Sequence, residues 1–487
     1  MMIESEQKFR KFGTRKPSFP EFSKDEKARK ALNLRRTKVL TMRNSHLPCH
    51  CKTTSLMCND SPSTSPVSKL DTEVIIVGNG PAGLSLSAFL SGWLPFYSPN
   101  DGPHPNHLIH EKLVEHKEES LLDQDLSWLD NSINVMNNGA RPLSLLYDTL
   151  VRPNADTGTL DRSKLCWIYD RNRAIPHLVV AETPVGGSWN NYDDDMISVS
   201  VGNFLDLPAF LVADWCGENK SYNRLSTPLY RRYLSDYARR VYKNKNIICG
   251  LKVTHIEKCS NSCMEEFWEV RGVKNGESVL LRCKKIVLAC GKNQDRLLGV
   301  KGELEENRIV YNLRDLKQLL TQPNTKFSKE KVVVVGDGVS AADSILHCLA
   351  SCIPVLHVIR RSDKQLRFVQ LSRLSPSIYP EYSKIFKLMM GYVKDYYYTK
   401  VTCASIESLN NGTVRIKSPQ GIFTEHFRVL CVCTGKQSDL SMLTDKYTFQ
   451  DYYCNEDPSL FRIGSLAGDH FVRYLVGGAM DVARCLM

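Results

Sequence analysis

The sequence of 487 residues has no run of about 18 apolar residues, which is the minimum for a helix that crosses a bilayer. Near its start, the charged residues Glu4, Lys8 and Arg10 interrupt every apolar stretch, and we expect no signal peptide. These two absences argue against channels, transporters and other integral membrane proteins. We therefore expect a chain with no integral membrane segment.

Cysteine pairs at the spacing of a redox centre are also missing. No two of the 17 cysteines are separated by two residues, so the C-x-x-C motif of dithiol disulfide reductases is absent. Several lie in apolar, strand-like stretches, and we expect reduced thiols and a cytoplasmic location, with nuclear and mitochondrial locations left open. A group near the start fits no zinc spacing, and no metal site is predicted there: His46, Cys49, His50, Cys51 and Cys58.

The net charge of +11 is concentrated in one segment. Residues 1–70 hold 15 Lys and Arg against 6 Asp and Glu, a net charge of +9, so the remaining residues carry only +2. A nearly neutral folded part lacks the basic face that binds a phosphate backbone, and we expect no nucleic acid partner. Residues 1–70 lack sustained periodicity and are rich in Lys, Arg, Ser and Pro, which predicts a disordered basic tail.

The sequence does contain a strand, a glycine turn and a helix in direct succession. An apolar run over 72–77 leads into the pattern G-x-G-x-x-G, and an apolar helical pattern follows. In a dinucleotide-binding turn the first glycine permits the tight turn, the second lets backbone approach a pyrophosphate, and the third lets helix and strand pack closely. The helix start then presents unpaired N–H groups to the phosphates. The predicted contacts are Gly78, Gly80, Pro81, Ala82 and Gly83.

The same succession recurs about 260 residues later, over 331–342, with the pattern G-x-G-x-x-A. Two such turns indicate two nucleotide sites, one for FAD and one for a nicotinamide dinucleotide. The next strand, 355–359, ends on two arginines, and Arg accommodates the 2′-phosphate of NADPH where an acid would accept from a free ribose hydroxyl. The predicted NADPH contacts are Gly336, Gly338, Ser340, Arg360 and Arg361.

The second strand expected after the first turn is delayed. Residues 93–170 are polar and loop-like and are interpreted as an insertion, and the strand follows only at 177–182. Glu182 at its end is a candidate for the FAD ribose hydroxyls, with a surface acid as the alternative. Gly186, Gly187 and Trp189 follow, a set that lets backbone pass a flat ring system; a glycine turn beside a buried Trp is the alternative.

Near the end of the chain, another predicted strand is followed by a glycine and a helix. A strand over 460–463 is followed by Gly468 and Asp469 and then by an apolar helix from about 471 to 486. An acid in this place is typical of the residue that holds the ribityl chain in flavoproteins. The helix start would also face the flavin pyrimidine, where reduction builds negative charge.

Together these patterns predict an α/β fold with two Rossmann-like dinucleotide-binding domains. The FAD-binding domain is expected to be discontinuous, over 71–325 and 427–487, with an NADPH-binding domain inserted over 326–426. No residue stands out as a catalytic acid or base, so the catalytic residues are left unassigned.

The order of motifs over 72–487 resembles the flavin-containing monooxygenase superfamily. A more specific set is similar to the animal oxidative stress-induced growth inhibitor family: YDTL at 147–150, VGGSW at 185–189, YPEY at 379–382, GDHFVRYL at 468–475 and GGA at 477–479. The resemblance implies an FAD- and NADPH-dependent monooxygenase that acts on a small molecule with a soft nucleophile. It also implies protein partners and a role in growth control and cytokinesis.

One motif of flavin-containing monooxygenases, F-x-G-x-x-x-H, is absent from the corresponding segment, roughly 300–313. Two other functions therefore stay open. The first is a non-catalytic regulator or scaffold that keeps the fold and FAD. The second is an NADPH-dependent reductase of an acceptor other than oxygen.

Overall fold

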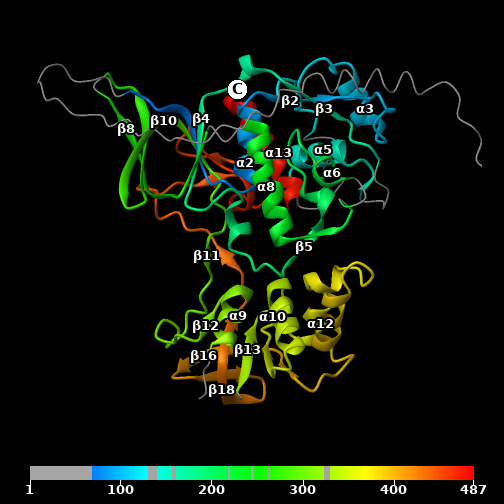
Figure 1. Ribbon diagram of the computed structural model, residues 1–487, viewed down its shortest axis with the longest axis vertical. Helices are drawn as coiled ribbons and strands as arrows, with labels where there is room; N and C mark the ends of the chain where they lie inside the picture. The colour runs from blue at the N-terminus through cyan, green and yellow to red at the C-terminus, as the bar shows by residue number, and fades with distance from the viewer. Residues whose placement is uncertain are drawn as a thin grey trace, which may run out of the picture. The chain divides into compact units, whose positions relative to one another are not determined.

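The structure is a computed structural model. It describes residues 69–487 apart from 130–139, 156–160, 218–219, 221, 243–245, 262 and 323–329. The predicted disordered tail of residues 1–70 thus lies almost entirely outside the described residues. The described residues belong to one compact unit and build two large β-sheets, each covered by helices (Figure 1).

The first sheet has the strand order β20-β21-β22-β10-β1-β4-β7, with β8 and β9 added as a meander next to β10. Its central strands β1, β4, β7, β10 and β22 are parallel, as the dinucleotide-binding fold requires. The strands are β1 (Thr72–Val77), β4 (His177–Ala181), β7 (Ile247–Cys249), β8 (Leu251–Ser260), β9 (Glu266–Lys274), β10 (Glu277–Leu288), β20 (Phe449–Gln450), β21 (Tyr453–Cys454) and β22 (Leu460–Arg462).

The second sheet has the order β15-β14-β13-β18-β17-β16, and β12 pairs with β18. Strands β12 to β15 and the end of β18 are parallel, while β16, β17 and the start of β18 form an antiparallel extension. The strands are β12 (Ile309–Val310), β13 (Lys331–Val335), β14 (Val355–Val358), β15 (Tyr398–Val401), β16 (Ser405–Asn410), β17 (Thr413–Ser418) and β18 (Gly421–Val432).

Elements β1 to β10 and β20 to α13 are called the first lobe below, and β12 to β18 the second lobe. The predicted fold class, two Rossmann-like α/β units, is confirmed. The boundaries at 326 and 426 stay a prediction, and the second sheet itself extends to residues 309–310 and 427–432.

The central strands are apolar throughout because both of their faces are buried. In β1, Val74 and Ile76 pack into one core while Ile75 and Val77 pack into the core on the other side. Strand β13 alternates in the same way between two cores of the second lobe. An alternation of apolar and polar residues, which marks a strand with one face in solvent, is therefore not expected in β1 or β13, and none occurs.

Helices fill the space on these sheets. They are α2 (Pro81–Leu90), α3 (His107–Val114), α5 (Pro142–Val151), α6 (Val212–Cys216), α8 (Thr227–Tyr242), α9 (Leu313–Thr321), α10 (Val339–Ala350), α11 (Asp363–Leu366), α12 (Pro380–Met390) and α13 (Val472–Leu486). The final helix α13 packs on both α2 and α5. Gly477 makes the crossing with α5 close, since a Cβ there would lie 2.3 Å from the Cα of Ser144. None of the helices in the described residues has the length and apolar character to span a bilayer.

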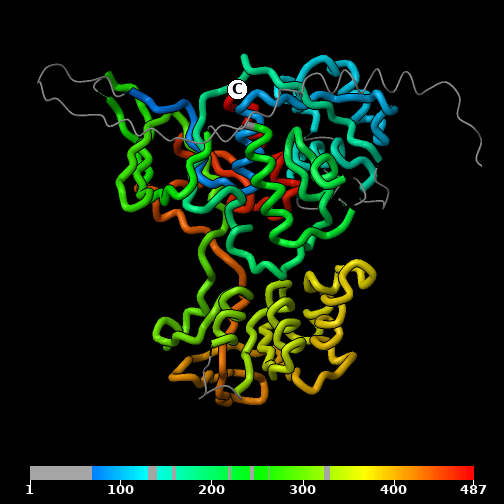
Figure 2. The backbone as a smooth tube through the Cα atoms, viewed as in Figure 1, coloured from blue at the N-terminus to red at the C-terminus, as the bar shows by residue number. Residues whose placement is uncertain are grey.

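The chain passes between the two sheets twice, once in each direction, as the tube in Figure 2 shows. The two passing segments pair as the antiparallel strands β11 (Gln294–Asp295) and β19 (Lys436–Gln437). Lys436 and Asp295 form an ion pair of 2.5 Å along this two-stranded ribbon.

Two expectations about the first lobe need correction. Residues 93–170 are not loop-like at their ends, because β2 (Trp93–Tyr97) and β3 (Leu165–Tyr169) form an antiparallel pair that closes the insertion. Pro95 argues against a central strand but is tolerated in a two-stranded sheet. The apolar runs over 279–281 and 285–291 predict two separate strands, but they belong to the single strand β10, which ends at Leu288, since no turn residue separates them. The remaining small pair is β5 (Ile197–Val201) with β6 (Arg224–Ser226).

Candidate functional site

The first glycine turn follows β1 and is shaped by two close approaches of backbone to backbone. Gly78 has a φ of +125°, and a Cβ there would lie 2.3 Å from the carbonyl oxygen of Ala289 at the end of β10. A Cβ on Gly83 would lie 2.0 Å from the carbonyl oxygen of Gly78. The first and third glycines are therefore needed for packing alone, before any ligand is considered.

The start of α2 is left open for a ligand. Its N-cap residue Gly80 provides no side-chain cap, and a Cβ on Gly80 would meet no atom nearer than 3.9 Å. The N–H groups of the first helical turn therefore have no side-chain cap, and a phosphate is their natural acceptor. Pro81 and Ala82 form the buried first turn, and Ala82 packs against Gly464 of the segment before α13.

The second glycine pair lies directly against the first turn. A Cβ on Gly187 would be 2.9 Å from the Cα of Gly80, and the N–H of Gly186 donates to the carbonyl of Asn79 at 3.0 Å. The buried side chain of Asn79 joins the two turns: its Oδ1 accepts from the N–H of Gly187 at 3.1 Å, and its Nδ2 donates to the carbonyl of Thr183 at 2.8 Å. The turn predicted to bind a pyrophosphate and the glycine pair predicted to pass a flat ring system thus lie side by side.

Trp189 follows the Gly186–Gly187 pair and lies in the 3-10 helix η3 (Gly187–Asn190). Its ring makes edge contacts with Tyr230 at 4.5 Å and Tyr192 at 5.4 Å between ring centroids. The side chain is half-buried and not sealed in a core, so a flat ligand can still reach it.

A cavity of about 660 Å³ opens at the carboxyl ends of β4 and β7. Glu182, Val185, Arg231 and Cys249 are among its lining residues. Ligands of open α/β sheets bind at this edge. Glu182 is exposed and faces this cavity, which is where its predicted contact with the ribose would have to occur.

Asp469 is buried and its carboxylate already has two protein partners. Arg141 donates to Oδ1 at 2.8 Å and the hydroxyl of Tyr452 donates to Oδ2 at 2.9 Å. Burial raises the pKa of Asp469, an effect that the charge of Arg141 opposes. A role in holding the ribityl chain stays a prediction, and it would require this carboxylate to accept a further hydrogen bond. The neighbouring Gly468 is exposed, with a φ of +103°.

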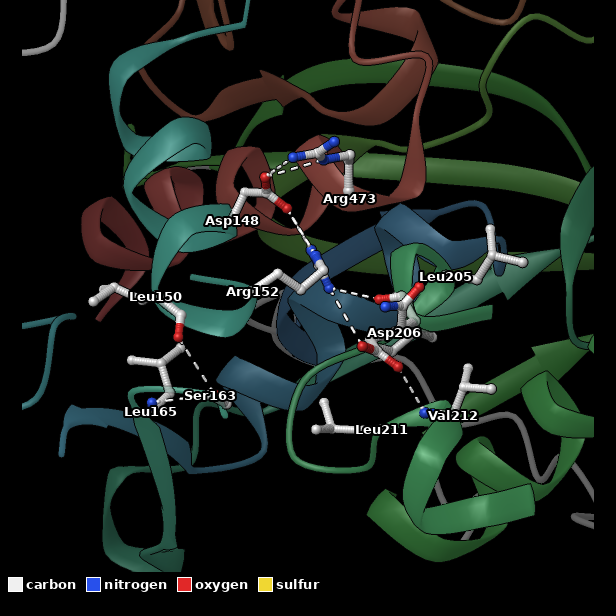
Figure 3. A network of polar contacts seen from close by, with 12 residues as sticks. Asp148, Leu150, Arg152, Ser163, Leu165, Leu205, Asp206, Leu211, Val212 and Arg473 are labelled. Atoms are coloured by element: carbon white, nitrogen blue, oxygen red, sulfur yellow. Dashed lines mark hydrogen bonds and ion pairs between the residues drawn. The ribbon is translucent and has the colours of Figure 1, made fainter. Parts of the chain in front are cut away.

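The first turn of α13 is anchored by a buried chain of charges (Figure 3). Arg473 donates Nε to Asp148 Oδ2 at 3.0 Å, and Arg152 donates Nε to Asp148 Oδ1 at 2.9 Å. Arg152 continues to Asp206 Oδ2 at 3.3 Å, and Asp206 accepts from the N–H of Val212 at 2.7 Å. Burial raises the pKa of Asp206 to about 7 against the opposing charge of Arg152. Two cations and two anions thus tie α13 to α5 and to the loop after η4 (Gly202–Leu205).

The second glycine turn repeats the geometry of the first. Gly336 has a φ of +124°, and a Cβ there would lie 2.3 Å from the carbonyl oxygen of Cys433 at the end of β18. Gly338 caps α10 without a side chain, and a Cβ on it would meet nothing within 4 Å. Ser340 is exposed on the first turn of α10. His357 of the neighbouring strand β14 contacts the turn, with its Nε2 2.5 Å from the carbonyl oxygen of Gly336.

The two arginines after β14 have different surroundings. Arg361 reaches back to the glycine turn and pairs with both oxygens of Asp337 at 2.5 Å. Arg360 is exposed, and no ion pair engages it within the described part of the chain. Arg360 is therefore the guanidinium that is available to a 2′-phosphate, while Arg361 would have to leave or share Asp337.

Several residues that shape the site could not be predicted from any motif in the sequence. Asn79 occupies an unrestricted position of its motif, and the arginines at 141, 152 and 473 meet partners far away in the chain. No group of metal-binding side chains is present among the described residues, and burial raises the pKa of the Cys290 thiol, directly after β10, to about 11.

Comparison with known proteins shows which families and relatives the chain is similar to. Residues 168–459 match a family described as pyridine nucleotide-disulphide oxidoreductase. The chain is 41% identical to the oxidative stress induced growth inhibitor homolog osgn-1 of Caenorhabditis elegans, over 85% of this chain and 94% of that protein. It is 28% identical to the human oxidative stress-induced growth inhibitor 2, over 89% of this chain and 95% of that protein.

Solved structures share the fold at low sequence identity. The bacillithiol disulfide reductase Bdr (YpdA) from Staphylococcus aureus gives a TM-score of 0.55 at 14% identity, over 86% of this chain and 98% of that one. The ornithine hydroxylase PvdA from Pseudomonas aeruginosa also gives 0.55, at 10% identity, over 85% of this chain and 100% of that one. A reductase and a hydroxylase match equally well, so the likeness shows the fold and does not choose between these reactions.

The prediction of FAD and NADPH as cofactors is confirmed by the match to the pyridine nucleotide-disulphide oxidoreductase family. The geometry is consistent with it. Both glycine turns lie at the carboxyl edge of a parallel sheet, and both helices begin without a side-chain cap.

Proposed function

Because the chain belongs to the oxidative stress-induced growth inhibitor family, a group of flavin oxidoreductases, we propose that it is an FAD- and NADPH-dependent monooxygenase. The proposed substrate is a small molecule that offers a soft nucleophile. Growth control, with cytokinesis and protein partners, is proposed from the family name and resemblance alone.

The observation that carries the proposal is the pair of open glycine turns. Each lies where a parallel strand passes into an uncapped helix, and each is made by a glycine pressed against the end of a neighbouring strand. One protein with two such sites can bind an electron donor and an electron acceptor at the same time.

When bound, NADPH supplies a hydride to the flavin ring of FAD, and reduced flavin passes electrons to an acceptor such as oxygen. The chain's own residues bind and orient. Gly78, Gly80 and Gly83 would cradle the FAD pyrophosphate with the N–H groups of α2. Gly187 and Trp189 would flank the flavin.

In the second lobe, Gly336 and Gly338 would hold the NADPH pyrophosphate, and Arg360 would bind the 2′-phosphate. A domain division at 71–325, 326–426 and 427–487 remains part of the proposal. The segment around 300–313, which lacks F-x-G-x-x-x-H, forms β12 and leads into α9.

That missing motif weakens the case for oxygen chemistry and leaves two candidates open, the non-catalytic regulator and an NADPH-dependent reductase of another acceptor. The reductase is the second catalytic candidate. Its sites would be the same, and only the fate of the electrons would differ. Absence of C-x-x-C in the sequence and the raised pKa of Cys290 speak against a dithiol centre beside the flavin.

The test is the visible spectrum of the purified protein, recorded before and after NADPH is added without oxygen. We expect flavin absorbance that NADPH bleaches and that oxygen restores. The matched variant Gly336→Ala keeps the first site and should stay yellow while bleaching slowly, because its Cβ would overlap the end of β18.

The outcomes separate the candidates. Oxygenated product from a soft nucleophile such as a thioether supports the monooxygenase. Bleaching with slow reoxidation by oxygen and fast reoxidation by another acceptor supports the reductase. A yellow protein that NADPH does not bleach supports a regulator with structural FAD, and a protein that cannot bind FAD refutes the proposal.

A further inference from the structure

The turn that carries Trp189 continues directly into a loop held by the second lobe. Arg314, in the first turn of α9, donates Nη1 to the carbonyl of Asn190 at 3.0 Å and Nη2 to the carbonyl of Tyr192. The last residue of η3 is thus bonded to a helix that belongs to the other sheet. Any movement of α9 is transmitted to the edge of the proposed flavin site.

One helical turn further along α9, Lys317 lies between two aspartates of the same loop. Its Nζ is 2.6 Å from Asp193 and 2.5 Å from Asp195. Asp193 is 11% exposed at its side chain and Asp195 is 84% exposed, so the pair with Asp193 is the one that solvent screens least. Burial disfavours the ammonium, but the bonds to both carboxylates outweigh it and raise the pKa of Lys317.

A second contact joins the lobes at the small β5–β6 sheet. Arg224 of β6 donates Nε to the carbonyl of Ser198 at 2.7 Å within its own lobe. Its Nη1 reaches across to Glu381 in the first turn of α12. Its Nη2 is buried and has no hydrogen-bond partner within the protein. Arg224 is 11% exposed at its side chain, so this cross-lobe ion pair is largely shielded from water.

The YPEY motif of the sequence analysis forms the other half of this contact. Tyr379 and Tyr382 stack with their planes 20° apart, and the Arg224 guanidinium lies 4.6 Å and 5.4 Å from the two ring centroids. The hydroxyl of Tyr379 donates to the carbonyl of Val199 in β5 at 2.6 Å. Tyr379, Glu381 and Tyr382 of the motif thus contact Arg224 or β5 at the junction between the lobes, a role their spacing did not indicate.

These two contacts complement the covalent connection. The β11–β19 ribbon alone is a pair of two-residue strands and leaves the second lobe free to turn about it. Contacts at α9 and α12, away from the ribbon, fix that rotation. Hydride transfer needs the donor and acceptor atoms about 3–3.5 Å apart, so lobe orientation sets whether the reaction can occur.

We propose that Arg314 and Lys317 on one side, and Arg224 with Tyr379 and Glu381 on the other, form a clamp that holds the second lobe in the orientation for hydride transfer. They are positioning residues, since none of them needs to touch the reacting atoms. This inference rests on the proposed NADPH-to-flavin reaction.

The test compares Lys317→Met, Tyr379→Phe and the restoring variant Lys317→Arg. The matched control is Lys417→Met, which removes an exposed lysine of β17 in the same lobe. Two quantities are measured: the rate of anaerobic flavin bleaching by NADPH, and amide hydrogen exchange over 190–199 in the protein without NADPH.

We expect Lys317→Met to bleach about 10–100-fold more slowly at saturating NADPH, with FAD content unchanged, since small misplacements of reacting atoms cost that much. Exchange over 190–199 should become faster in the same variant. Tyr379→Phe, the milder change, should shift both quantities in the same direction, and Lys317→Arg should restore them. Lys417→Met should behave like the parent protein.

Parent-like bleaching in Lys317→Met and Tyr379→Phe, with parent-like exchange, would overturn the clamp. Faster exchange with an unchanged bleaching rate would also overturn it, because the contact would then be structural only. If the parent protein is not bleached by NADPH at all, the proposed function fails, whereas unchanged exchange in the variants separately shows that the lobe contact itself is wrong.

Discussion

The buried charge chain at the start of α13 allows a sharp prediction for Asp148→Asn. The change keeps the shape of the side chain and removes its charge, leaving two guanidinium groups that both depended on it, those of Arg152 and Arg473. Asp148 is 2% exposed and Arg152 is 4% exposed, so water cannot replace the lost partner. Arg152 keeps Asp206 as a partner when Asp148 is neutralised.

Breaking a buried ion pair by removing one partner costs about 3–5 kcal/mol in the free energy of unfolding. For a cooperative unit of about 300 residues, an unfolding entropy of roughly 0.6 kcal/mol/K converts this to a fall in Tm of about 5–8 °C. Because Arg473 lies in the first turn of α13, we also expect weaker FAD retention.

The assay is thermal unfolding at a fixed excess of FAD, since ligand concentration alone shifts Tm. The matched control is Asp101→Asn, whose partner Arg162 lies 3.7 Å away on the surface. An exposed pair of this kind contributes about 0–1 kcal/mol, so its Tm should fall by less than about 2 °C. Equal Tm values for the two variants would refute the idea that the buried chain stabilises α13 through its charges.

Three further predictions concern the site and its pH dependence. Asn79→Ala should weaken FAD binding about 10–100-fold in a fluorescence titration, because it leaves the N–H of Gly187 and the carbonyl of Thr183 without their side-chain partner, whereas parent-like affinity would contradict a joining role. Arg360→Gln should lower the preference for NADPH over NADH by about 10–100-fold, and an unchanged preference would assign the 2′-phosphate to Arg361 instead. Burial lowers the pKa of His177 and of His357 to about 4, so both stay neutral in the fold and both should become charged on unfolding below pH 6.5. The folded state is therefore favoured fully above about pH 6.5, and this contribution to the free energy of unfolding is lost as the pH falls towards 4. His357→Gln should make Tm fall less steeply with decreasing pH, and an unchanged slope would contradict a buried neutral His357.

Local patterns predicted most of the fold because the central strands obey local rules. Both strand–turn–helix units and α13 begin and end near the expected residues, since apolar period and glycine position suffice to define them. The β2–β3 pair escaped because Pro95 and the long insertion between its strands hid it. A pairing over some 70 residues has no local signature.

The residues of the site also fall into two groups, those that a local motif predicts and those whose partners are distant in the chain. The glycine turns at Gly78 and Gly336 were predicted from their motif between a strand and a helix, and the structure adds that each glycine lies against the end of a neighbouring strand. Side chains that act through distant partners were not predicted. Asn79, Arg141 and Lys317 are ordinary polar residues whose neighbours are set only by the finished fold.

The packing of α13 on α2 and α5 has a consequence for how the protein is made. Strand β1 and helix α2 leave the ribosome early, yet β22 and α13, which complete their sheet and core, follow the whole second lobe in the chain. The inserted lobe can fold while the first still lacks its closing elements, so the first lobe has contacts of very high sequence separation and should fold last and slowly. A nascent chain would then expose the apolar surface of α2 until α13 has been synthesised and can pack on it. We expect chaperones to bind this surface in the meantime. We also expect FAD to favour the last folding step of this lobe.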